Sequence, residues 1–191
     1  MNRLIVHLIC GITLVLAQTI IAGAELRAEQ MKQVEFLGLA SKLPASWQEE
    51  QPSSDMRLAQ FVVPGGREDL AAYLIVYYFG QGQGGSAEAN INRWQSQFSK
   101  PGGGVVEPSI EKLEVSGMAV TVVELRGDYA RGVGMGPAGS AAPDRILLAS
   151  IVEAPRGNLY IQLHGPAATV SAQRKTYLDF IRQIQRLPTA R

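Results

Sequence analysis

The sequence predicts an α+β fold, in which a mostly antiparallel sheet of about six or seven strands carries helices on both faces. Three observations predict it. Short apolar stretches follow one another across hairpin-length turns, two segments show helical spacing of their apolar residues, and residues 71–79 form an uninterrupted apolar run. A run this short, rich in β-branched and aromatic residues, is typical of a central strand covered on both faces.

The N-terminal segment predicts export. Residues 1–24 carry one positive charge, at Arg3, and an uncharged stretch that ends in Ala22-Gly23-Ala24. This pattern is typical of a cleaved signal peptide, and an uncleaved membrane anchor is the alternative because about 20 apolar residues span a bilayer. We therefore expect a periplasmic or secreted protein, with a tether at 25–33 and a single α+β domain at 34–188. Contact with a membrane is expected only through the N-terminal segment, if it stays uncleaved.

Charge and cysteine content exclude several classes of partner. The chain has 18 Lys and Arg against 17 Asp and Glu, so the loss of Arg3 with the signal peptide leaves 17 of each. A neutral chain gives no electrostatic reason to expect nucleic acid or an anionic membrane as a partner. The single cysteine, Cys10, leaves with the same segment. The exported chain is therefore expected to be free of disulfides and to depend on its hydrophobic core.

Each element follows from a local pattern of apolar and turn-forming residues. Pro44 and Trp47 mark a turn after the first strand, Pro64 stops the second, and Ser116-Gly117 turns a hairpin. Ser86 can cap a helix whose apolar face includes Ala87, Ile91, Trp94 and Phe98. The expected strands are residues 34–39, 57–63, 71–79, 110–115, 118–126, 145–153 and 158–164. The expected helices are the one after Ser86, ended by Pro101, and one at about 169–186, and the expected polar or mobile loops are 48–55 and 127–144.

A glycine-rich turn separates the central strand from the first helix. Gly80, Gly82 and Gly85 match the pattern G-x-G-x-x-G, which in dinucleotide-binding folds cradles a pyrophosphate. That chemistry needs repeated β-α-β units, whereas hairpins follow here, and no lysine follows the glycines. We therefore interpret Gly80, Gly82, Gly84 and Gly85 as a tight structural turn, and expect no nucleotide or other cofactor.

Residue types that carry catalysis or bind metals are sparse. His164 is the one histidine after the signal segment, so it lacks the companions of a catalytic or zinc site and is interpreted as structural. Tyr73, Tyr77 and Phe79 share one face of the central strand, where we predict core packing rather than a stacking platform. Paired carboxylates could still act in hydrolysis, but nothing marks two partners among the acids near element ends, Asp55, Asp69, Asp128, Asp144 and Glu153.

Several motifs carry a resemblance to known proteins. Residues 56–65, 77–98, 145–153 and 163–166 resemble an uncharacterised family of exported bacterial proteins, most specifically in the glycine turn and helix of 77–98. The order of elements, beginning with Leu-Pro-x-x-Trp at 43–47, is similar to the PsbP-like fold, an antiparallel sheet between helices. The resemblance implies a non-catalytic binding or assembly protein, because relatives of that fold mostly have such roles. It carries over no functional residue.

Two functional hypotheses follow from the sequence. The first is a non-catalytic extracytoplasmic binding or assembly module whose partner is an unknown protein or small molecule. Its expected contact residues are the polar ones on the turn and helix, Gln81, Gln83, Asn92 and Arg93. The alternative is a small-molecule-binding protein or carboxylate-based hydrolase that uses a cleft between the glycine turn (80–85) and the 127–144 loop.

The signal peptide makes the first testable prediction. Cleavage after Ala24 gives a mature chain that begins at Glu25, which intact-mass measurement of the exported protein detects. A measured mass that still includes residues 1–24 would favour the membrane anchor.

Overall fold

The computed structural model describes residues 29–130 and 141–188. The predicted signal peptide and the centre of the predicted 127–144 loop, residues 131–140, lie outside the described residues. No helix within the described ranges is long and apolar enough to cross a membrane. In chain order the elements are β1 (Met31–Phe36), β2 (Leu39–Pro44), β3 (Gln48–Glu50), β4 (Arg57–Val63), η1 (Glu68–Leu70), β5 (Ala72–Tyr78), α1 (Ala87–Gln95), β6 (Phe98–Ser99), β7 (Ser109–Val115), β8 (Met118–Tyr129), β9 (Ala142–Val152), β10 (Leu159–Pro166), α2 (Ala167–Arg182) and β11 (Gln185–Arg186).

The strands form two antiparallel sheets. The eight-stranded sheet has the order β3-β4-β5-β10-β9-β8-β6, and β7 also pairs with β8. A smaller sheet has the order β1-β2-β11. The predicted α+β class with a mostly antiparallel sheet is confirmed. More strands are present than predicted, because short edge strands such as β3, β6 and β11 are too brief to show a pattern in sequence.

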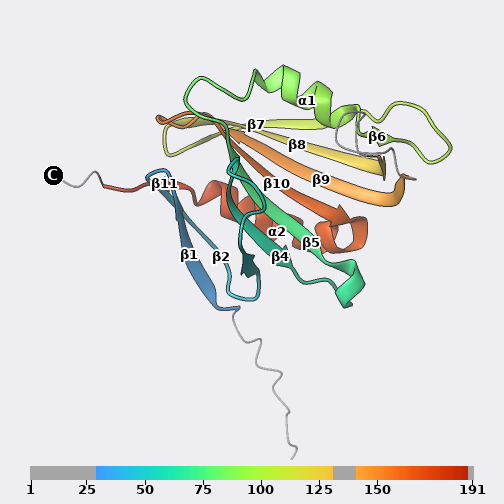
Figure 1. The fold of residues 1–191 in the computed structure, drawn as a ribbon, viewed down its shortest axis with the longest axis horizontal. Coiled ribbons are helices and arrows are strands. Elements are labelled where there is room, and N and C mark those ends of the chain that lie inside the picture. Colours follow the sequence, from blue (N-terminus) through green and yellow to red (C-terminus); the bar gives the residue numbers. More distant parts are fainter. Residues whose placement is uncertain (1–28, 131–140, 189–191) are drawn as a thin grey trace, which may run out of the picture.

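The two helices lie on opposite faces of the larger sheet, as predicted (Figure 1). On one face, α2 packs against β9 and β10, and Phe180 and Ile181 join a large core that also holds Leu74 of β5 and Phe36 of β1. On the other face, Trp94 of α1 joins a smaller core formed by β8, β9 and Tyr160 of β10. Alternation along each strand divides the apolar side chains between these two cores.

The N-terminal region differs from the prediction. The single strand expected at 34–39 is wrong, because Leu37 and Gly38, with φ of 51° and 77°, turn a hairpin between β1 and β2. Leucine rarely adopts a positive φ, so Gly38 alone did not predict a two-residue turn at this position. The hairpin begins at Met31, inside the predicted 25–33 tether. The loop expected at 48–55 begins with a short strand, β3, which pairs with β4 and forms the edge of the larger sheet.

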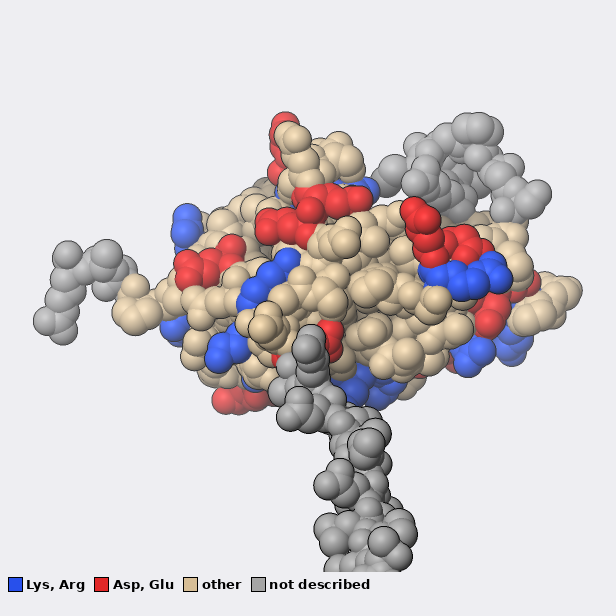
Figure 2. Space-filling view, turned by 90° about the horizontal axis from the view of Figure 1, so that it is seen from below, with Lys and Arg blue, Asp and Glu red and all other residues tan. Residues whose placement is uncertain are grey.

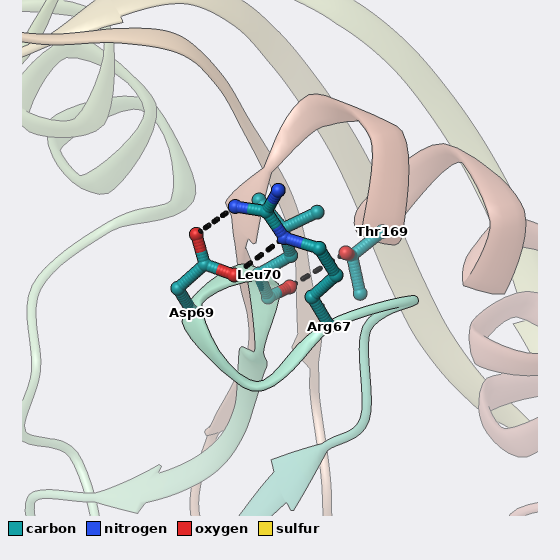
Figure 3. Close-up of polar contacts among 4 residues, drawn as sticks. All are labelled: Arg67, Asp69, Leu70 and Thr169. Carbon is teal, nitrogen blue, oxygen red and sulfur yellow. Dashed lines mark hydrogen bonds and ion pairs between the residues drawn. The ribbon is translucent and has the colours of Figure 1, made fainter.

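The C-terminal helix also begins earlier than predicted. Pro166 ends β10 and α2 starts at once at Ala167, so the strand is not broken at Gly165 as expected. Thr169 in the first turn donates a 2.6 Å hydrogen bond to the carbonyl of Leu70, which attaches the η1 turn to the helix (Figure 3). The helix ends at Arg182 rather than near 186, because Gln185 and Arg186 pair with β2 as β11.

The most polar contact of the main core centres on Tyr177 of α2. Its ring is fully buried, and its hydroxyl lies 2.7 Å from Ser150 Oγ and 2.9 Å from the Ile161 carbonyl oxygen. One hydrogen bond therefore ties the helix to β9 and another to β10. Burial raises the pKa of Tyr177, against the opposing effect of Ser150, so the phenol stays protonated in the folded protein.

Tyr177→Phe tests this contact. Removal of the hydroxyl leaves two buried partners unsatisfied, and we expect the free energy of unfolding at pH 7 to fall by about 1–3 kcal/mol. The pKa of Tyr177 is raised in the folded state, so its contribution to the free energy of unfolding is complete below the pKa of a free tyrosine, about 10. Above that pH the unfolded chain ionises first, and the contribution is lost at about 1.4 kcal/mol per pH unit. Urea unfolding between pH 7 and 11 should show a smaller alkaline loss in the variant. Tyr73→Phe is the exposed control, and an alkaline slope unchanged by Tyr177→Phe would contradict the assignment.

Candidate functional site

The glycine turn fixes the position of α1 on the sheet. Gly80, Gly82, Gly84 and Gly85 all have positive φ, between 70° and 103°. A Cβ atom on Gly84 would lie 2.6 Å from the hydroxyl oxygen of Tyr160, so the backbone passes directly over this ring. The same hydroxyl donates a 3.0 Å hydrogen bond to the carbonyl of Gly85. The turn is therefore close-packed against β10 at the start of the helix.

Asn90 joins the turn to the helix. Its side chain is 2% exposed, and Nδ2 donates to the carbonyls of Gly84, at 2.7 Å, and Ser86, at 2.9 Å. Ser86 also caps the helix, as predicted, because its Oγ accepts a 3.1 Å hydrogen bond from the amide of Ala89. The oxygen of the Asn90 side chain accepts a 2.5 Å hydrogen bond from Arg93 Nη2. A buried amide thus sets both the shape of the turn and the direction of an exposed arginine.

The four expected contact residues are exposed, but they do not share one surface. Gln81 and Gln83 lie in the turn itself. Asn92 faces a groove between α1 and β7, whereas Arg93 does not line this groove. Burial raises the pKa of Tyr77, and the positive charge of Arg93 is one of the influences that oppose this rise. Their role in binding stays a prediction. Arg93 is the one that the structure joins to the larger feature described next.

The sheet face beneath α1 is only partly covered. The helix lies on the β8 side of the sheet, away from β4 (Figure 1). Tyr73 of β5 is 38% exposed on this face, whereas its neighbour Leu74, which points to the α2 side, is 0% exposed. We call this less covered region the tyrosine face; cross-strand pairing brings together its residues Gln60, Val62, Tyr73, Ile75, Tyr77, Gln162 and His164, of which Gln60 and Ile75 are buried.

The sequence predicted core packing for the aromatic residues on this side of residues 73–79, but not all of them lie in the core. The Tyr73 ring stacks on His164 with centroids 5.8 Å apart, and both rings reach the surface. Tyr77 and Phe79 stack at 6.2 Å and are half-buried, with Phe79 also packed edge-on against Tyr160. The prediction of core packing holds only for the Phe79 end of this row, beside α1. The expectation that β5 is covered on both faces holds at Ile75, which is 3% exposed, but not at Tyr73.

Arg57 is a site residue that sequence reasoning missed. Its guanidinium lies over the Tyr77 ring, 5.6 Å from the centroid, and donates a 2.6 Å hydrogen bond to Gln60 Oε1. Gln60 is 9% exposed and donates in turn to Glu50 of β3, at 2.8 Å. Burial raises the pKa of Tyr77, although the nearby Arg57 opposes the shift, so its hydroxyl remains a donor at neutral pH. A β-bulge between Arg57 and Ala59 breaks the alternation that could have placed Arg57 from sequence.

A second concave feature lies on the other flank of α1. This groove, of about 480 Å³, runs between α1 and β7 and is shallow. Its apolar lining includes Ile91 and the exposed Ile110, and three carboxylates stand around it: Glu88, Glu107 and Glu153. Of the acids singled out in the sequence, only Glu153 lies here. Within the described residues no group of three His, Cys, Asp or Glu side chains could hold a metal ion.

The cleft expected between the glycine turn and the 127–144 loop is not supported. The end of β5 next to the turn pairs with the start of β10, at Leu159, and that strand start pairs with the end of β9, at Val152. The ends of the 127–144 segment that are described continue β8 to Tyr129 and begin β9 at Ala142, at the opposite end of the sheet. The described residues of the two segments therefore do not form one site.

Surface charge gives no strong field on the side of the molecule seen in Figure 2. Basic and acidic side chains are interspersed there without a large area of one sign. The described residues also form ion pairs at the surface, such as Arg67 with Asp69 and Arg174 with Glu124. Such pairs contribute little to stability.

Three solved structures share this fold. They are a Pseudomonas aeruginosa protein of unknown function (TM-score 0.50, 13% identity, 84% of this chain and 99% of that one), the cyanobacterial PsbP of Synechocystis (0.54, 12%, 85% and 95%) and LpqN of Mycobacterium tuberculosis, involved in cell envelope biogenesis (0.53, 12%, 84% and 92%). At these identities the likeness shows the fold alone, and it confirms the predicted PsbP-like fold. No protein-family model matches the chain, and no curated protein gives a significant match. Membership of a family of exported bacterial proteins stays a prediction.

Gly84→Ala tests the anchoring of the turn. The new methyl group meets the Tyr160 ring and also requires a left-handed backbone, so we expect a loss of about 3 kcal/mol or more in the free energy of unfolding. Gly82→Ala is the matched control, because its φ is also positive but no atom lies within 4 Å of its Cβ position. It should cost only about 1 kcal/mol. Equal losses in urea unfolding would show that the contact with Tyr160 does not hold the turn.

Proposed function

We propose that the chain is a non-catalytic extracytoplasmic binding or assembly module that docks a partner protein on the tyrosine face. The observation that carries the proposal is the uneven cover of β5 and β10. Towards α2, Leu74, Val76 and Leu163 are 0% exposed, whereas on the other side Tyr73 is 38% exposed and Ile75, two residues along the strand, is 3% exposed. A sheet face that is ordered but incompletely covered suits an interaction surface better than a core.

The side chains of the tyrosine face fit a protein partner. Tyrosine and arginine are the residue types that most often dominate binding energy at protein interfaces. Tyr73 is held by its stack on His164 and Arg57 by Gln60, so both lose little conformational freedom on binding. Gln162 of β10 adds a half-exposed amide next to Ile75. The surface is therefore rigid, amphipathic and supplied with hydrogen-bond donors.

The extracytoplasmic part of the proposal rests first on the signal-like sequence of residues 1–24. Among proteins of similar fold, LpqN is described as involved in cell envelope biogenesis, and another is a cyanobacterial PsbP. These descriptions belong to those proteins, and they support the proposal only by showing that the fold occurs in such settings.

The alternative, a small-molecule-binding protein, is favoured by one observation, the groove between α1 and β7. Its carboxylates and the apolar pair Ile91 and Ile110 could hold a small cationic ligand. The tyrosine face is preferred for the main function because its polar groups are oriented by buried neighbours, whereas the groove is shallow and most of its polar side chains are exposed.

Tyr73→Ala tests the proposed function. The exported protein, tagged at its C-terminus and recovered under native conditions, should capture a specific partner. We expect the variant to weaken that complex by about 30-fold, or about 2 kcal/mol, because a central tyrosine is lost. Its free energy of unfolding should change by less than about 1 kcal/mol, since the ring is exposed and contributes mainly its stack on His164.

Ile110→Ala is the matched control, because it removes an exposed apolar side chain from the groove instead. A complex weakened by Ile110→Ala but not by Tyr73→Ala would move the binding site to the groove. If no partner is captured and the pure protein turns over compounds from a hydrolase panel, the proposal is wrong.

A further inference from the structure

Two arginines at the border of the tyrosine face, one on β4 and one on α1, are oriented by buried side-chain amides. Arg57, on β4, donates to the side-chain oxygen of Gln60, which is 9% exposed and held by Glu50. Arg93, on α1, donates to the side-chain oxygen of Asn90, which is 2% exposed. The helix and the sheet thus each supply one fixed guanidinium.

Both guanidinium groups retain donors that no described residue uses. An arginine has five N–H donors, of which Arg93 gives one to Asn90, and Arg57 gives one to Gln60 and also interacts with the Tyr77 hydroxyl. Neither residue forms an ion pair with a described carboxylate, since Glu50 is bound by Gln60 and the ion pairs of the described chain involve other arginines and a lysine. Their positive charges are therefore available to a ligand.

The two arginines lie around Tyr77. Arg57 lies over its ring, 5.6 Å from the centroid. On the other side, Tyr160 is the cross-strand partner of Tyr77 and lies against Gly84, whose carbonyl accepts a hydrogen bond from Asn90, the residue that holds Arg93. Tyr77 therefore lies between Arg57 of β4 and the turn that carries α1 and Arg93.

We propose that Arg57, Arg93 and the Tyr77 hydroxyl bind a carboxylate from an acidic segment of the partner protein. A planar guanidinium matches a carboxylate through two parallel hydrogen bonds, and the phenol adds a third donor. The inference rests on the proposed function in taking the occupant to be a protein.

The surroundings favour a protein carboxylate over a phosphate or an anionic lipid. The stacked rings of Tyr77 and Phe79 lie beside Arg57, and the exposed ring of Tyr73 lies four residues along the same strand from Tyr77. These rings suit the apolar side chains of an extended peptide. A membrane or polyphosphate partner is attracted by a dense basic surface, whereas the exported chain carries equal numbers of basic and acidic residues. Charge complementarity is therefore local: the two arginines can pair with one or two acidic side chains of a partner protein.

The test uses a fluorescently labelled hexapeptide of alternating Glu and Leu, its Gln–Leu counterpart, and the chain that begins at Glu25. We expect the Glu peptide to bind at least about tenfold more tightly than the Gln peptide at low salt, and to weaken as salt is added. Arg57→Gln and Arg93→Gln should each weaken it about tenfold, and Tyr77→Phe about threefold. Arg67→Gln is the control, because this exposed arginine is paired with Asp69 on the η1 turn and should change binding less than twofold (Figure 3).

Three outcomes would overturn the inference. They are equal binding of the Glu and Gln peptides, an Arg67→Gln loss as large as the other two, and competition by inorganic phosphate or phosphatidylglycerol vesicles as strong as by unlabelled Glu peptide. Failure here is distinguishable from failure of the proposed function. If Tyr73→Ala weakens capture of the partner while Arg57→Gln and Arg93→Gln do not, the docking face stands and the carboxylate site falls.

Discussion

The contact between Gly84 and the ring of Tyr160 determines most of what is distinctive in this molecule. Because the backbone passes directly over the ring, and the Tyr160 hydroxyl bonds to Gly85, α1 can begin only at this point above β10. A helix is about 10 Å wide and strands lie about 4.8 Å apart, so a helix along the strands covers about two of them. With α1 anchored on the β8 side, β4 and β5 are less covered on that face, and Tyr73 stays exposed.

Much of the fold could be predicted, because alternation and turn residues are local signals. The strand from Arg57 to Val63 and the hairpin at Ser116-Gly117 follow directly from such patterns, and Ser86 caps the helix as its position predicts. The β1–β2 hairpin could not be predicted, because its turn places Leu37 at a positive φ that only the completed sheet stabilises. Likewise, β11 exists only because β2 offers an edge, which no local pattern reveals.

The candidate site was predictable only in part, for a different physical reason. Arg93 was singled out because it lies on an exposed helical position next to the glycines. Nothing in the sequence links it to Arg57, because the two are joined only through Tyr77 and through the packing of α1 on the sheet. Residues 71–79 have the composition of a strand buried on both faces, and that composition cannot distinguish a face covered by the chain itself from one that a partner covers. The exposure of Tyr73 can therefore be recognised only in the folded structure.

The two faces of the sheet carry different kinds of side chain. The α2 face holds the large continuous core and the buried Tyr177, so substitutions there act on the folding equilibrium. The α1 face holds a smaller core and a border of oriented polar groups, of which Gln60 and Asn90 are buried while the arginines they hold are not. Buried amides of this kind cost solvation that their hydrogen bonds must recover. The side-chain oxygens of Gln60 and Asn90 each accept a hydrogen bond from an arginine. This bond stabilises one orientation of the guanidinium and adds little to the packing of the core. Fixed donors of this kind are what the proposed docking face requires.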